Sequence, residues 1–326
     1  MSMTKFVMRR VLEIFITMLI IATLIFALYR LMPADPASMV LNAKMTPELR
    51  ETLRIRFGLD KPLWEQYLIY INNLLHGEFG TSFYWEGDVF NILKARLLPT
   101  ILLFTTGTVL AHALGIYLGR IIAWRRGGKL EYGSTTLSLF LYTMPIFWVG
   151  LLAIWVFSYK LDLFPVGGMK TPEIWSAAGG VSLLTKIADV AHHLFLPLTV
   201  YTLVVFAGCM LLMKNSMLET VREDYIITAR AKGLPETVIR NRHAARNALL
   251  PVVTAMSLAM AFSFNGGVIA ETTFSWPGLG KTLVEASMSY DYPLAQGAFI
   301  MLAGVVLVAV LFADILYAYL DPRITY

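Results

Sequence analysis

The stretch LLPTILLFTTGTVLAHALGIYLG, residues Leu97–Gly119, contains no Asp, Glu, Lys or Arg. An α-helix needs about 20 mainly apolar residues to cross the hydrocarbon core of a bilayer, and this stretch is long enough. Because lipid offers the backbone no hydrogen-bond partners, a segment that crosses it must be helical. The stretch therefore predicts a helix that spans a membrane.

Windows of the same kind recur along the chain. A further window, Val11–Tyr29, contains only one charged residue, Glu13. The other charge-free windows are Tyr132–Tyr159, Val190–Met213, Asn247–Ala270 and Tyr292–Ala313. Together these windows predict an all-α integral membrane protein with six transmembrane helices, organised as one domain over residues 1–326.

The composition supports this class and excludes others. Hydrophobic residues make up 57% of the chain and charged residues only 15%, whereas soluble domains carry about 25% charged residues. A soluble enzyme and a disordered chain are therefore excluded, and the single cysteine, Cys209, excludes a scaffold of intrachain disulfides. Lys and Arg of the short connecting segments concentrate on the side of the N-terminus, which predicts that both termini are cytoplasmic.

The segment between the first two windows, residues 32–96, is predicted to be an external insertion. Thr46-Pro47-Glu48 has the cap, proline and acidic residue of a helix start, and Gly58 is placed to end that helix. A second amphipathic helix is predicted to follow Pro62 and to stop near Gly77. We expect the insertion to cover the outer mouth of the bundle and to contact an external partner.

The cytoplasmic segment between the fourth and fifth windows is long for a connection within a helical bundle. Gly233-Leu234-Pro235 predicts a corner, because Gly suits a left-handed helix cap and Pro cannot continue a helix. Short helices are predicted on both sides, with Tyr225, Ala229 and the turn at Ala231 and Lys232 on one face of the first, and Glu236–Arg246 forming the second. This pattern leaves two interpretations open, a docking surface for a soluble partner or a solvated loop whose arginines bind lipid headgroups.

At this segment the chain resembles the permease subunits of binding-protein-dependent ABC importers, most closely their dipeptide and oligopeptide branch. The resemblance runs in order through nearly the whole chain. Its motifs are Arg9-Arg10, Pro33-Ala34-Asp35-Pro36, Gly58-Leu59-Asp60-Lys61-Pro62, Gly77-Glu78-Phe79-Gly80-Thr81-Ser82, Met144-Pro145, Glu223 to Leu234, Arg242-His243-Ala244, Arg246 to Pro251, Glu271 to Gly280 and Asp321-Pro322-Arg323-Ile324.

The resemblance implies a type I ABC-importer permease bundle in the plasma membrane of a prokaryote, with residues 214–250 as the ATPase-coupling loop. It implies a second homologous permease, two ATP-binding subunits and an extracytoplasmic solute-binding protein as partners. The chain itself would hold no cofactor, since ATP and Mg would be bound by the ATPase subunits. The residues that would contact the ATPase are Asp224, Tyr225, Thr228, Ala229, Arg230, Ala231, Lys232, Gly233 and Leu234.

Other motifs were weighed for catalysis, metal binding and a transport pathway. Gly278-Leu279-Gly280-Lys281-Thr282 lacks the first glycine of a phosphate-binding loop, so a turn that opens a helix is expected there. Adjacent residues such as His192 and His193 do not share a helical face, and no catalytic or metal site is predicted. His112, Asn265 and Glu271 are candidates for lining the pathway; His112 lies in the middle of a predicted span, where an ionisable residue is often functional.

The expected function is thus to form half of a pathway for di- or oligopeptides and to couple it to ATP hydrolysis by partner subunits. Two alternatives remain for the cargo, nickel or an oligosaccharide. An autonomous channel or proton-coupled carrier is disfavoured because Glu13, Glu271 and Asp314 lie at the ends of the windows rather than at mid-membrane. An intramembrane enzyme is disfavoured because no paired catalytic constellation is found.

Overall fold

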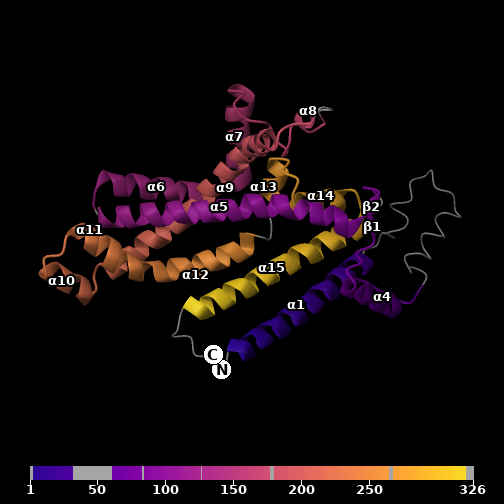
Figure 1. The fold of residues 1–326 in the computed structure, drawn as a ribbon, viewed down its shortest axis with the longest axis horizontal. Coiled ribbons are helices and arrows are strands. Elements are labelled where there is room, and N and C mark those ends of the chain that lie inside the picture. Colours follow the sequence, from indigo (N-terminus) through magenta and orange to yellow (C-terminus); the bar gives the residue numbers. More distant parts are fainter. Residues whose placement is uncertain are drawn as a thin grey trace.

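A computed structural model describes residues 3–31, 61–82, 84–125, 127–176, 180–263 and 267–320 of the chain. The described part is almost entirely helical, with one short antiparallel pair of strands (Figure 1). The helix predicted to start at Thr46 lies outside the described residues. The elements are α1 (Met3–Leu31), α4 (Leu63–Leu75), β1 (Thr81–Ser82), β2 (Gly87–Asp88), α5 (Val89–Trp124), α6 (Lys129–Thr143), α7 (Ile146–Ala153), η1 (Ile154–Lys160), α8 (Pro172–Trp175), α9 (Leu183–Thr220), α10 (Asp224–Ala231), α11 (Glu236–Val238), η2 (Ile239–Ala244), α12 (Ala245–Ser263), α13 (Val268–Thr273), α14 (Leu279–Met288) and α15 (Tyr292–Leu320).

Within the described residues, four helices are long and apolar enough to cross a membrane, and a bent pair raises the number to at most five. The four fall in α1, α5, α9 and α15. The predicted count of six is therefore not confirmed. The predicted window Asn247–Ala270 is divided between α12 and the separate short helix α13.

The window Tyr132–Tyr159 is not one straight helix. Helices α6 and α7 meet at 101°, and the π-helix η1 extends α7. Pro145 explains the bend, since its ring lacks a donor and clashes with a preceding turn. Met144, as a residue before proline, adopts the extended conformation, with φ −75° and ψ 131°.

Helices α5 and α9 pack most closely, because glycines of α5 face α9. A Cβ atom added at Gly115 would lie 2.7 Å from the sulfur of Cys209, and one added at Gly119 would lie 2.8 Å from the carbonyl oxygen of Met210. These glycines let the two backbones approach. The stripe of small residues at Gly107, Ala111 and Gly115 therefore serves packing within this chain.

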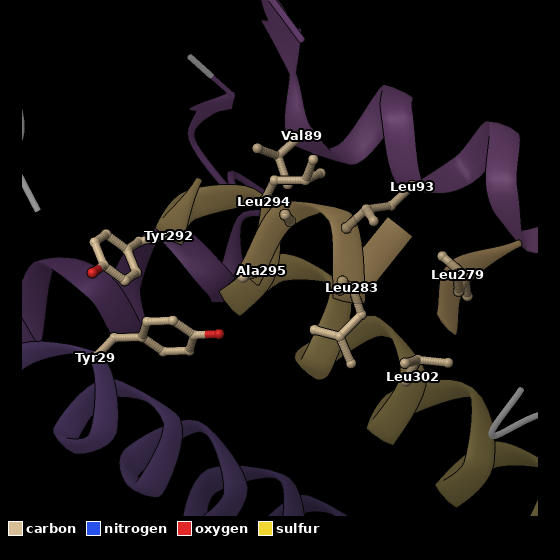
Figure 2. Close-up of a cluster of buried hydrophobic side chains, with 11 residues drawn as sticks. Tyr29, Val89, Leu93, Leu279, Leu283, Tyr292, Leu294, Ala295 and Leu302 are labelled. Atoms are coloured by element: carbon tan, nitrogen blue, oxygen red, sulfur yellow. The ribbon is translucent and has the colours of Figure 1, made fainter. Parts of the chain in front are cut away.

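A buried apolar cluster joins α1, α5, α14 and α15 (Figure 2). Figure 2 shows Val89 and Leu93 of α5 beside Leu294 of α15. The rings of Tyr29 and Tyr292 meet edge to face with centroids 5.4 Å apart. This cluster lies near β1 and β2, whereas α10 and α11 lie at the opposite end of the molecule (Figure 1). The N-terminal end of α1 and the C-terminal end of α15 both lie far from β1 and β2 (Figure 1).

A largely buried ion pair links α6 to α9. The Nζ atom of Lys214 lies 2.9 Å from Oε1 of Glu131, and the two side chains are only 11% and 13% exposed. Lys214 also donates a hydrogen bond of 2.9 Å to Oγ1 of Thr135. Since α9 leads directly into α10, this pair holds the base of the α10 segment against α6.

Candidate functional site

Helix α10 is a short surface helix with well-defined ends. Asp224 in its first turn and Arg230 in its last turn have the charges that the helix dipole favours. Gly233 follows with φ +73°, as predicted for the corner. The N–H of Gly233 donates to the carbonyl of Arg230 at 2.9 Å, and that of Leu234 donates to the carbonyl of Ala229 at 3.4 Å. This pair of bonds is a Schellman motif, and Pro235 then ends the turn.

The second predicted helix, Glu236–Arg246, is not a separate short helix. Ile239 and Ala245, at the junctions of α11, η2 and α12, keep right-handed helical dihedrals. The helical path therefore continues from Glu236 to Ser263. The Gly233 corner connects α10 to a long helix of the bundle, so a displacement of α10 reaches α12 without an intervening flexible loop.

Two buried side chains fasten α10 to the bundle. Ile226 is 0% exposed and Ala229 is 5% exposed, and both belong to one apolar cluster. The same cluster contains residues from α5, α9, η2 and α12 (Ala123, Met213, Met217, Ile239, Ala244 and Ala248). Of the predicted face of Tyr225, Ala229 and Ala231, only Ala229 packs here, while Tyr225 and Ala231 are exposed. Ala229, predicted as a contact residue, is thus buried within this chain.

Polar contacts tie α10 to three other elements. Arg230 pairs with Glu236 of α11, with Nε 3.1 Å from Oε1, and its guanidinium lies 5.6 Å from the ring centroid of Trp124 at the end of α5. Asn247 of α12 donates a hydrogen bond of 2.6 Å to the hydroxyl of Tyr225. Exposed ion pairs contribute little stability, so the buried Ile226 and Ala229 dominate the attachment.

The exposed face of α10 carries both polar and apolar side chains. Asp224, Ile227, Thr228 and Ala231 are all exposed, and their spacing of i, i+3, i+4 and i+7 places them on one helical face. Ile227 is 58% exposed and was not among the predicted contact residues. The same spacing counted from Asp224 could have found it. The other predicted contact residues Arg230, Lys232, Gly233, Leu234 and Tyr225 are also exposed.

The three candidate pathway residues lie elsewhere. His112 is 4% exposed, and its Nδ1 lies 2.8 Å from the carbonyl oxygen of Thr108. Glu271 is 0% exposed. Asn265 lies outside the described residues. The two described side chains are enclosed by this chain, so a role in lining the pathway stays a prediction.

The Glu271 carboxylate binds the start of α14. Thr100 of α5 donates to its Oε1 at 2.7 Å, and the backbone N–H of Lys281 donates to its Oε2 at 2.9 Å. The glycine-rich stretch from Gly278 thus opens a helix, as predicted, and the anion at this helix start is the chain's own carboxylate.

A groove of about 1020 Å³ runs between α1, α5, α12 and α15. Apart from Lys94 and Ser257, its lining is apolar or glycine, with Met18, Met256 and Val305 contributed by three different helices. Its apolar lining, drawn from four helices, suits contact with other apolar helices.

Comparison with known proteins identifies the family. Residues 115–326 match the family described as "Binding-protein-dependent transport system inner membrane component", and residues 3–104 match the family described as its N-terminal membrane component. The chain belongs to this family. Its motifs and its several apolar helices agree with a multi-pass inner-membrane permease component.

Relatives of this family align along nearly the entire length. The oligopeptide transport system permease protein AppB of Bacillus subtilis is 37% identical, covering 99% of this chain and 100% of that protein. The di/tripeptide transport system permease protein DppB of Pseudomonas aeruginosa is 36% identical over 99% of both chains. The dipeptide transport system permease protein DppB of Escherichia coli is 35% identical, also over 99% of both.

Proposed function

We propose that this permease component forms half of the translocation pathway of an ATP-driven importer of di- or oligopeptides. Its partners are a second homologous permease, two cytoplasmic ATPase subunits and an extracytoplasmic solute-binding protein. The full-length similarity to peptide permeases supports the cargo. The apolar groove between α1, α5, α12 and α15 supports contact with the second permease.

The observation that carries the coupling role is the geometry of α10. One face of α10 is buried in the bundle through Ile226, and the opposite face presents Ile227 to the outside. A soluble partner that binds the exposed face can therefore move α12 and α9 through buried contacts. ATP-driven closure of the ATPase dimer then favours one of two bundle conformations, because the partner binds α10 differently in each.

Both termini and α10 are proposed to be cytoplasmic, and residues 32–96 are proposed to be external and to contact the binding protein. Single-cysteine variants at Lys170 and Lys281 should react with an impermeant thiol reagent in intact cells. Variants at Lys129 and Glu236 should react only after the membrane is permeabilised. Protection of both Lys170 and Lys281 would overturn this orientation.

The coupling role is tested by purifying the transporter with its ATPase subunits and measuring binding-protein-stimulated ATP hydrolysis in nanodiscs. Ile227→Asp places a charge on the exposed face and should reduce ATPase co-purification. Val166→Asp, at an exposed apolar site in the loop between η1 and α8, is the matched control and should not. Equal behaviour of the two variants would show that α10 is not the docking surface.

A further inference from the structure

Helix α4 exposes its apolar stripe and buries a polar residue, the reverse of an amphipathic helix in a soluble protein. Its apolar stripe is Trp64, Leu68, Ile71 and Leu75, spaced at i, i+4, i+7 and i+11, of which Ile71 is half-buried and the other three are exposed. Trp64, Leu68 and Leu75 are 64%, 57% and 69% exposed. Soluble amphipathic helices bury such a stripe against the core. Here the most buried residue of α4 is the polar Gln66, which is only 8% exposed.

Contacts with α1 place α4 beside a membrane-spanning helix rather than beyond its end. The hydroxyl of Tyr67 lies 2.8 Å from Oγ1 of Thr23, and the rings of Tyr67 and Tyr70 each lie 5.4 Å from that of Phe26. Thr23 precedes the last residue of α1, Leu31, by about 12 Å of helix at a rise of 1.5 Å per residue. Tyr67 is therefore held well back from the end of α1.

The position of the apolar part of α1 shows how deep in the membrane this contact lies. The apolar part, Val11–Tyr29, comprises 19 residues, or about 28 Å, close to the hydrocarbon core of about 30 Å. The edge of the core on the α4 side therefore lies near Tyr29, six residues beyond Thr23 along the helix. The contact between Tyr67 and Thr23 accordingly falls inside the edge of the hydrocarbon core. Figure 1 shows α4 lying across this end of α1 rather than extending it.

The chemistry around the stripe is that of a membrane interface. The helix combines Trp64 with two tyrosines, and aromatic residues of these types concentrate at the boundary between headgroups and acyl chains. Glu65 and the exposed Asn72 flank the stripe on one side, where headgroups and water would lie. None of the described residues of α4 lines the apolar groove assigned above to the second permease.

We propose that α4 is an interfacial helix whose stripe of Trp64, Leu68, Ile71 and Leu75 inserts among the acyl chains of the outer leaflet. The occupant of this face is lipid. The helix anchors residues 63–75 to the membrane surface, so that the exposed face of α4 is not available to the binding protein. The inference does not depend on the cargo or on ATPase docking.

Spin labels test the proposal in the complete transporter, reconstituted in phosphatidylcholine nanodiscs. Cys209, which is buried and is the chain's one cysteine, is first replaced by Cys209→Ala. A label at Leu68 should be relaxed by oxygen and inaccessible to a water-soluble nickel chelate. A label at Asn72, one turn further along α4 on its polar side, is the matched control and should be more accessible to the chelate. Access of the chelate to Leu68 equal to that at Asn72 would overturn the proposal.

A photo-crosslinking residue at Trp64 distinguishes lipid from protein. Capture of phospholipid, read by mass spectrometry, supports insertion into the leaflet, whereas capture of the second permease or the binding protein overturns it. Leu75→Glu provides a third readout, because a charge on the stripe should shift the Leu68 label towards greater chelate access. An unchanged Leu68 label in that variant would count against a lipid environment.

Discussion

Replacing Gly233 by valine should misplace α10 while leaving the membrane helices intact. Gly233 has φ +73°, and a left-handed backbone costs a residue with a side chain about 1–2 kcal/mol. No atom lies within 4 Å of a Cβ built at this position, so steric contact adds nothing and the backbone cost stands alone. A change of this size lowers the population of the native corner about 5–30-fold relative to its alternatives.

The corner matters because three contacts depend on it. Relaxing φ at position 233 breaks the Schellman hydrogen bonds from Gly233 and Leu234. It also turns Glu236 away from Arg230, whose Nε now lies 3.1 Å from the Glu236 carboxylate. The exposed face of α10 then loses its fixed direction relative to α12. Because the buried anchors Ile226 and Ala229 precede the corner, insertion into the membrane should be normal.

Co-purification of the ATPase subunits and binding-protein-stimulated ATP hydrolysis measure the effect. Gly233→Asn should be milder than Gly233→Val, because Asn adopts the left-handed region more readily. Gly168→Val is the matched control, since Gly168 has φ +84° and equally free space but lies in the loop between η1 and α8. The reasoning is refuted if Gly233→Val behaves as wild type, or if Gly168→Val reduces ATPase association as strongly.

Three further predictions concern the packing, each checked by the midpoint of thermal unfolding in detergent. Ile226→Ala should lower the free energy of unfolding by about 2–5 kcal/mol, because it removes a buried side chain. Ile227→Ala, one residue later but exposed, should change it by less than about 0.5 kcal/mol and weaken only ATPase association. Equal losses of stability in the two variants would contradict the assigned faces. Glu271→Ala leaves buried donors without a partner and should cost about 1–3 kcal/mol for each, so an unchanged midpoint would rule out its structural role. Gly115→Ala should destabilise by about 1–3 kcal/mol because a Cβ there meets α9, whereas Gly133→Ala, with open space around it, should be neutral or stabilising.

Local chemistry explains the elements that sequence reasoning predicted well. The helix after Pro62 ends at Leu75, close to the predicted stop near Gly77, and the Gly233 corner has the predicted positive φ. Both depend on a few adjacent residues whose backbone preferences are strong. The sequence did not indicate which side of α10 is buried, since the choice between Ala229 and Ile227 as the inner residue depends on where α9 and α12 lie.

The sequence by itself determined that the chain is helical and membrane-embedded, because long charge-free windows have no other stable structure in lipid. Tertiary structure alone decided how those windows are divided, as the 101° bend at Pro145 and the separation of α12 from α13 show. It also decided that Glu271 meets Thr100, a residue 171 positions away. In lipid, the backbone N–H and C=O groups must find hydrogen-bond partners within their own helix, and this local requirement can be read from composition. The partner of a buried side chain depends instead on which distant helix packs against it.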